Sequence, residues 1–308
     1  MSEDVMDKDE ARPGTTRCGF CAIIGAPNAG KSTLVNQLTG SKVSIVSHKV
    51  QTTRARIRAI AMEGQTQIVL VDTPGIFKPR RTLDRAMVEN AWGGAGEADA
   101  VVYLVDGRPG VTDDAKALIA QLEATKTKAI LVINKIDLMK REDLLETAAA
   151  FNAAYPFEQT FMVSALNASG TADLRKAIAA KMPEGPFLYP EDQVADLQLR
   201  FMAAEMTREK IYERLHEELP YASTVETEGW EERKDGSVKI DQVIYVERDS
   251  QKAIVLGKGG QTVKLLGQLA RAEMEKYFER KVHLFLFVKV RENWAEDKER
   301  LRNMGLDI

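Results

Sequence analysis

Short apolar runs, separated by longer segments of mixed polarity, dominate the first part of this chain. Runs at 20–24, 68–71, 101–106, 130–133 and 161–163 end in polar or turn residues, which is the pattern of buried strands. Strands that alternate with helical segments from residue 20 to about 181 predict an α/β domain, with a doubly wound, mostly parallel sheet and helices on both faces. Ligands bind such sheets at the carboxyl ends of the strands, so the residues after each run are the candidate functional residues.

The later part of the chain predicts a smaller α+β domain. Apolar residues recur at helical spacing over 196–219, and residues 221–230 and 237–247 alternate as two strands around a hairpin turn at 234–236. A glycine-containing loop at 257–260 then lies between two helices, the second of which ends near residue 278. A strand at 281–290 follows, in which the apolar run 284–288 is too short for a membrane span and predicts a buried strand. An amphipathic helix at 294–304, which Gly305 is placed to end, completes the domain.

A proline-rich, acidic stretch separates the two parts and is typical of a linker. The predicted organisation is a disordered tail (1–17), a first domain (18–183), a linker (184–195) and a second domain (196–308).

Composition limits the classes of partner. The formal net charge of −3 means that any nucleic-acid site must be a local basic patch. The acidic N-terminus has neither a signal-peptide nor a transit-peptide pattern, so we expect a cytoplasmic protein. Cys18 and Cys21 have a C-x-x-C spacing, but the chain has no other cysteine and only three histidines, so we interpret the pair as buried structural residues.

The first candidate site follows the first predicted strand. Residues 25–32 fit the phosphate-binding pattern G-x-x-x-x-G-K-[ST] at every fixed position, and a predicted helix begins directly after them. The glycines allow backbone N–H groups to surround an anion at the helix N-terminus. Lys31 can reach the β and γ phosphates, and the Ser32 hydroxyl can ligate Mg²⁺. The predicted contact residues are Gly25, Ala26, Pro27, Asn28, Ala29, Gly30, Lys31, Ser32 and Thr33.

Two further segments complete the phosphate end of the site. Asp72 ends a predicted strand, where a carboxylate can hold the Mg²⁺ shell, and the Gly75 N–H can reach the γ phosphate. We therefore include Asp72, Thr73, Pro74, Gly75 and Ile76 in the predicted site, and we expect residues 76–85 to form a mobile loop. A threonine in the polar segment 47–58, Thr52 or Thr53, can close on Mg²⁺ and the γ phosphate.

The base end of the site follows the next two predicted strands. Asn134, Lys135, Ile136 and Asp137 form the sequence N-K-x-D, in which the carboxylate can accept two hydrogen bonds from guanine N1–H and its 2-amino group. Adenine offers no such pair of donors. Ser164 and Ala165, with Leu166 after them, can supply a backbone N–H to guanine O6.

These motifs in this order resemble those of the Era branch of GTPases. The resemblance implies binding of GTP and GDP, Mg²⁺ as cofactor, and Thr53 rather than Thr52 as a Mg²⁺ ligand; the predicted catalytic residues are Lys31, Thr53, Asp72 and Gly75. Ile76 occupies the position where many GTPases place a water-orienting glutamine, so we expect slow hydrolysis. The resemblance further implies K⁺ as a catalytic cofactor bound at Asn28.

The second domain resembles the type II K-homology (KH) domain of the same family. Its G-x-x-G loop with a basic residue inside is the feature that clamps a nucleic-acid backbone. The predicted RNA-contact residues are Lys252, Ile254, Gly257, Lys258, Gly259, Gly260 and Lys264. The family resemblance implies a monomer that binds 16S ribosomal RNA near its 3′ end, assists assembly of the 30S subunit and associates weakly with the inner membrane.

Three alternatives remain from the sequence. A metabolic P-loop NTPase would not need N-K-x-D and would show no preference for GTP over ATP. An RNA-binding protein with a structural, non-cycling nucleotide site would show negligible turnover. A tRNA-modifying GTPase would resemble the chain only in the first domain.

Overall fold

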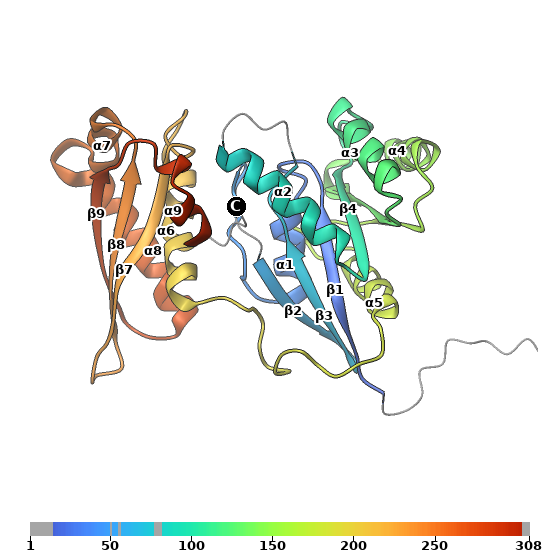
Figure 1. The fold of residues 1–308 in the computed structure, drawn as a ribbon, viewed down its shortest axis with the longest axis horizontal. Coiled ribbons are helices and arrows are strands. Elements are labelled where there is room, and N and C mark those ends of the chain that lie inside the picture. The colour runs from blue at the N-terminus through green and yellow to red at the C-terminus, as the bar shows by residue number, and fades with distance from the viewer. Residues whose placement is uncertain (1–14, 50, 55–56, 77–81, 304–308) are drawn as a thin grey trace, which may run out of the picture.

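Two domains make up the computed structural model, which describes residues 15–49, 51–54, 57–76 and 82–303. Figure 1 shows the first domain, with its six-stranded sheet, beside a second domain that contains a three-stranded sheet. Helix α6 (Leu199–Arg214) lies between the smaller sheet and the first domain.

The six-stranded sheet has the order β2-β3-β1-β4-β5-β6. Its strands are β1 (Arg17–Ile24), β2 (Ile57–Glu63), β3 (Thr66–Asp72), β4 (Ala100–Asp106), β5 (Ile130–Asn134) and β6 (Gln159–Met162). All neighbours pair in parallel except β2, an antiparallel edge strand on β3. The doubly wound, mostly parallel sheet is therefore confirmed, whereas the run at 57–63 was not predicted as a strand.

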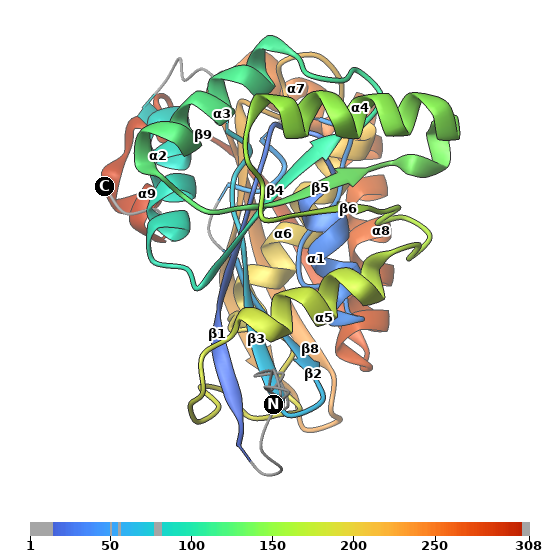
Figure 2. The same cartoon turned by 90° about the vertical axis from the view of Figure 1, so that its right-hand side faces the viewer.

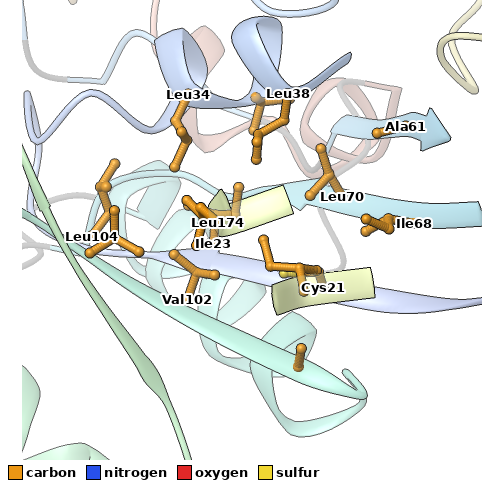
Figure 3. Packing of buried hydrophobic residues seen from close by; sticks show 14 of the residues in the cluster. Cys21, Ile23, Leu34, Leu38, Ala61, Ile68, Leu70, Val102, Leu104 and Leu174 are labelled. Atoms are coloured by element: carbon orange, nitrogen blue, oxygen red, sulfur yellow. The ribbon is translucent and has the colours of Figure 1, made fainter. Parts of the chain in front are cut away.

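Helices cover both faces of this sheet because successive strand residues point to opposite sides. On one face, Cys21 and Ile23 of β1 pack with α1 (Lys31–Thr39) and α5 (Thr171–Lys181), and Figure 3 shows these side chains meeting Leu34 and Leu174. On the other face, the intervening residues of β1 pack with α2 (Thr82–Gly96), α3 (Asp113–Thr125) and α4 (Arg141–Ala154). Burial raises the pKa of the Cys21 thiol to about 12, as expected for a structural cysteine.

The second domain packs three helices on one face of a three-stranded sheet. After α6 come β7 (Ser223–Glu232), β8 (Val238–Val246), α7 (Asp249–Leu256), the 3₁₀ turn η2 (Lys258–Gly260), α8 (Gln261–Phe278) and β9 (Val282–Val290). The order is β7-β8-β9, with β7 and β8 antiparallel and β8 and β9 parallel. The predicted order of elements is confirmed, although α6 is shorter than the predicted helix at 196–219.

Two predictions about irregular segments need correction, whereas the structure places no helix or strand in the predicted linker at 184–195. Arg17, placed in the predicted disordered tail, lies in β1 and forms a bridge to Glu184, while residues 1–14 lie outside the described residues. The expected loop at 76–85 overlaps the start of α2 at Thr82, and its residues 77–81 also lie outside the described part. The predicted linker runs along the sheet, where Gln67 hydrogen-bonds the backbone of Leu188 and Tyr189.

The predicted helix at 294–304 is wrong as a single helix. It is split into the 3₁₀ turn η3 (Trp294–Glu296) and α9 (Lys298–Asn303), because the backbone of Asp297 is extended; residues 304–308 are not described. Trp294, Ala295 and Leu301 are buried against Leu83, Ala86 and Met87 of α2. Figure 2 shows α9 beside α2, so the end of the second domain packs on the first.

None of the helices formed by the described residues is long and apolar enough to cross a membrane.

Candidate nucleotide site and RNA interface

The predicted phosphate-binding loop joins β1 to α1, and its glycines permit two close approaches. A Cβ on Gly25 would lie 2.2 Å from the carbonyl oxygen of Leu104, and one on Gly30 would lie 2.3 Å from Asn134 Nδ2. Gly30 also has a positive φ of 102°, which other residues rarely adopt. These glycines bring the loop onto the carboxyl ends of β4 and β5, the second of which carries the N-K-x-D motif.

Four side chains meet at the N-terminus of α1. Lys31 is fully buried, and its Nζ donates to the carbonyl oxygens of Gly25 and Ala26 at 3.1 and 3.0 Å. Ser32 Oγ lies 2.8 Å from Thr53 Oγ1, which lies 3.4 Å from Asp72 Oδ2. Thr52 instead hydrogen-bonds Ser47 and the Lys49 carbonyl, so Thr53 is the threonine beside Ser32.

Burial shifts the pKa values of both charged groups in this cluster. Desolvation lowers the pKa of Lys31 to about 8, although the nearby Asp72 carboxylate acts in the opposite direction. Desolvation likewise raises the pKa of Asp72, against the opposing effects of Lys31 and the neighbouring hydroxyls. A cluster that buries charge at this cost is typical of a site that receives a charged ligand.

The donor set at Asp72 fits a hard cation such as Mg²⁺. Asp72 Oδ1 is buried and has no hydrogen-bond partner among the described residues, while its other oxygen, Oδ2, lies beside the linked hydroxyls of Thr53 and Ser32. Mg²⁺ prefers oxygen ligands of this kind and usually takes few of them from the protein. Ser32 and Thr53 would hold the ion, and Asp72 would orient its shell.

Asn134 ties the two ends of the site together. Its Nδ2 donates to the Ala29 carbonyl at 2.8 Å, and its Oδ1 accepts from the Ala165 N–H at 2.9 Å. The N–H expected to reach guanine O6 is thus bonded to Asn134 in this structure. Lys135, whose φ is 66°, bonds the Asn28 carbonyl at 2.6 Å and Asp106 at 2.8 Å, which places Asp137 at the rim of the same cavity.

A single cavity of about 330 Å³ connects the two ends. Most predicted residues line it: Pro27, Asn28, Gly30, Lys31, Ser32, Thr33, Thr53, Gly75, Asn134, Lys135, Asp137, Ala165 and Leu166. Others lie behind its wall: Gly25, Ala26, Ala29, Asp72, Thr73, Pro74, Ile76, Ile136 and Ser164. Thr73 turns inward to bond the Ile23 carbonyl at 2.7 Å. The Ile76 side chain is buried in the core, and its N–H donates to the Gly25 carbonyl, so this position offers the cavity no polar side chain.

Sequence reasoning missed part of the lining. Residues Ile45, Val46, Ser47, His48, Lys49, Gln51, Arg108 and Leu138 also line the cavity. Arg108 was detectable, since it follows β4 at the same sheet edge, where it pairs with Asp106 at 2.6 Å. The residues at 45–51 carry no motif that distinguishes them from a polar edge loop.

The loop that carries Thr53 also forms the contact with the second domain. Arg54 donates to the Ser223 carbonyl at 2.9 Å and to the Tyr212 hydroxyl at 3.1 Å. Lys49 donates to the carbonyls of Tyr212 and Leu215, and Lys42 pairs with Glu209 at 2.5 Å and with Glu273. Residues 42–49 and 51–54 therefore lie between the nucleotide cavity and α6.

A second buried arginine, Arg208 of α6, also contributes to this contact. Arg208 is 2% exposed, pairs with Glu205 at 2.5 Å and donates to the carbonyls of Gln51 and Thr52. Together with Glu209 and Tyr212, these residues form one stripe of α6 that faces the first domain.

The predicted RNA-contact residues lie together on the loop between α7 and α8. Lys258 and Gly259 are exposed, as are Lys264 on α8 and Ile254 on α7, whereas Lys252 is half-buried. Gly257 has a φ of 72°, and a Cβ there would lie 2.1 Å from Thr262 Oγ1. Its lack of a side chain is therefore required by the loop itself, whether or not a phosphate approaches.

Comparisons with known proteins agree with both domains. A family model described as 50S ribosome-binding GTPase matches residues 20–135, and one described as KH domain matches residues 218–295. The chain is 61% identical to GTPase Era of Brucella suis over 97% of this chain and 96% of that protein, and 62% identical to GTPase Era of Afipia carboxidovorans over 99% and 98%.

Two solved structures of Era superpose on the whole molecule. Each has a TM-score of 0.90 and 35% identity and covers 95% of this chain and 100% of the solved chain. One is a variant of Aquifex aeolicus Era bound to GDP and aluminium fluoride. The other is Era in complex with MgGDPNP and nucleotides 1506–1542 of 16S ribosomal RNA.

Proposed function

Because the chain belongs to the Era family of GTPases, we propose that it is a GTP-hydrolysing switch that binds 16S ribosomal RNA near its 3′ end through its KH domain and assists 30S assembly. The observation that carries the nucleotide part is the arrangement of Lys31, Ser32, Thr53 and Asp72 at one end of a cavity whose other end is lined by Asp137. The exposed G-x-x-G loop supports the RNA part.

The chain's own residues account for nucleotide binding as follows. Lys31 and the N–H groups at the start of α1 hold the β and γ phosphates, and Asp137 accepts from the guanine edge. Mg²⁺, when bound, neutralises charge on the β and γ phosphates. Asn134 hydrogen-bonds both the phosphate loop and the loop at Ala165, and so fixes the position of one relative to the other. Because Ile76 is buried, the attacking water must be oriented by another group, and hydrolysis is slow.

Turnover with GTP and ATP tests the nucleotide part. The full chain should release phosphate from GTP and not from ATP, and Lys31→Ala should abolish turnover. Equal turnover of ATP would favour a metabolic P-loop enzyme. Absence of GTP turnover would favour a structural nucleotide site.

A test of RNA binding needs a variant that leaves the conformation of the G-x-x-G loop intact. Gly257 is unsuitable because its Cβ would meet Thr262, so Lys258→Glu is the better probe, with exposed Lys128→Glu of the first domain as its control. Fluorescence anisotropy with the 3′-terminal segment of 16S ribosomal RNA, at fixed salt, should show weaker binding for Lys258→Glu alone. Equal affinity for a scrambled RNA would overturn the ribosomal target.

Three further proposals rest on family resemblance. We propose K⁺ binding at Asn28, which lines the cavity, a monomeric state, and weak peripheral association with the inner membrane. Unchanged GTP turnover when K⁺ is replaced by Na⁺ would refute the first. Light scattering tests the second, and sedimentation with anionic lipid vesicles tests the third.

A further inference from the structure

Residues 284–288 lie in the edge strand β9 of the second domain, as predicted, but the prediction that this strand is buried is wrong for every second residue. Only alternate side chains of β9 enter the core, among them Val282, Leu286 and Val288. Phe285 and Phe287 point to the opposite, open face of the sheet, where they are 46% and 53% exposed. Aromatic side chains at such exposure lie about 6.6 Å apart along a strand and form a ready surface for stacking.

The same face of β9 is basic on both sides of the phenylalanines. Reading every second residue, the outward series is Lys281, His283, Phe285, Phe287, Lys289 and Arg291. We call this series the outer β9 stripe. Aromatic rings interspersed with cations are the combination that single-stranded nucleic acid recognises, since bases stack on the rings while phosphates meet the charges.

Acidic residues on the neighbouring strands confine this surface to the edge of the sheet. Lys289 lies 3.4 Å from Glu228 of β7, and Lys239 of β8 pairs with Asp241 at 2.8 Å while its Nζ lies 5.6 Å from the centre of the Phe285 ring. Arg291 pairs with Asp297 at 2.8 Å. The carboxylates on β7 and β8 repel phosphates from the middle of the sheet, so a nucleic acid strand would run along β9.

The outer β9 stripe and the helices beside the G-x-x-G loop lie on opposite faces of the same edge strand. Helices α7 and α8, which flank the G-x-x-G loop, pack on the inner face of β9. Because β9 is an edge strand, a chain that leaves the loop on one side can pass around that edge to the other side. Figure 1 shows β9 on the side of the second domain that faces away from the first domain.

We propose that the outer β9 stripe is a second RNA-contact surface, on which single-stranded nucleotides flanking the segment held by the G-x-x-G loop stack on Phe285 and Phe287. This inference rests on the proposed RNA binding and extends it. Lys281 and His283 contact phosphates beside the phenylalanines, and Lys289 and Arg291 do so by exchanging their carboxylate partners, Glu228 and Asp297, for phosphate oxygens. Recognition here is tolerant of base identity, because every base has a face that can stack.

The test compares two single-stranded RNAs from the 3′-terminal segment of 16S ribosomal RNA on the full chain. One has about 8 nucleotides, which is enough to fill the site at the G-x-x-G loop, since a KH domain clamps about four. The other extends the same core to about 20 nucleotides, which is long enough to reach a second surface. Phe285→Ala/Phe287→Ala should weaken binding of the long RNA about 10-fold or more and leave the short RNA unchanged. Lys258→Glu should weaken binding of both.

A second variant reports stacking directly. Phe287→Trp keeps an aromatic ring, so it should retain affinity for the long RNA, and its added fluorescence should be quenched by the long RNA and not by the short one. Circular dichroism checks that each variant is folded.

Each outcome separates the inference from the proposed function. If neither RNA binds the wild-type chain, the proposed RNA binding fails. If both bind but the double alanine variant is unchanged on the long RNA, the outer β9 stripe is not an RNA surface. If the double variant changes the mass of the protein in light scattering and not its RNA affinity, the stripe is instead a contact between two copies of the chain.

Discussion

The buried arginine next to Thr53 allows the domain contact to be tested quantitatively. Arg54 is 4% exposed, and its guanidinium donates to the Ser223 carbonyl and the Tyr212 hydroxyl, with longer contacts to the carbonyls of Pro220 and Tyr221. Its charge also lies 5.3 Å from the centre of the Trp294 ring. Desolvation lowers the pKa of Arg54, so part of the energy of these contacts is offset by the cost of burying the charge.

Arg54→Met keeps most of the aliphatic stem and removes the donors. The Ser223 carbonyl and the Tyr212 hydroxyl each lose a charged donor, at about 1–2 kcal/mol each, although the hydroxyl keeps its hydrogen bond to the Gln51 carbonyl. We therefore expect a loss of about 2–4 kcal/mol in the free energy of unfolding. The matched control is Arg58→Met. Arg58 is 53% exposed at its side chain and lies 3.8 Å from Asp196, an exposed pair that contributes at most about 0.5 kcal/mol.

Urea unfolding, followed by both tryptophan fluorescence and circular dichroism, measures these differences without screening the charges. Trp294 is a useful reporter because it is buried under Arg54, with its indole N–H bonded to the Ala222 carbonyl. If Arg54→Met loses no more stability than Arg58→Met, the hydrogen bonds of Arg54 do not hold the two domains together, and the reasoning is refuted.

Three further predictions follow from the site and the interface. Thr53→Ala should weaken Mg²⁺-dependent binding of a non-hydrolysable GTP analogue about 10-fold, whereas Thr52→Ala should not; equal losses in a titration would contradict the assignment. The pKa of Lys31 is depressed to about 8, so above that pH the Lys31 amine of the empty site is mostly neutral, and binding of anionic GDP, which favours the charged amine, takes up a proton. The affinity for GDP should therefore fall as pH rises above 8. Calorimetry of GDP binding at pH 8.5, in two buffers with different heats of ionisation, should give different binding heats. Identical heats would exclude proton uptake on binding. Trp294→Ala should cost about 3–5 kcal/mol of unfolding free energy in urea, and a loss below 1 kcal/mol would show that the contact with α2 contributes little.

The core of the first domain was predictable because its strands are buried on both faces. Such strands consist of continuous apolar runs, and the motifs begin where the runs stop, as Asp72 ends β3 and Asn134 ends β5. The edge strand β2 gave a weaker signal, since Arg58, its second residue, is exposed and its last two residues are half-buried. Positions that tertiary pairing alone determines are hard to predict from a local pattern.

The interface was not predictable for a different reason. Glu205, Arg208 and Glu209 are charged residues on a helix, and such residues are usually on the surface. Here Arg208 is buried because it meets carbonyl groups of residues 51 and 52, which lie more than 150 residues away in sequence. The prediction for the apolar run of β9 was wrong in the opposite sense, because Phe285 and Phe287 are about half exposed and no helix among the described residues covers them. In both cases the outcome depends on what lies opposite the side chain.

The position of Arg54 next to Thr53 has a consequence for the switch. Consecutive Cα atoms are about 3.8 Å apart, so Thr53 cannot leave Ser32 by several ångströms without displacing Arg54 from Ser223 and Tyr212. A ligand that stabilises one position of Thr53 must therefore also favour one arrangement of the domain contact. By linkage the effect is reciprocal: whatever binds the second domain and alters its contact with Arg54 changes the affinity for that ligand by the same factor. The nucleotide cavity and the second domain are thus coupled through two adjacent residues of one loop.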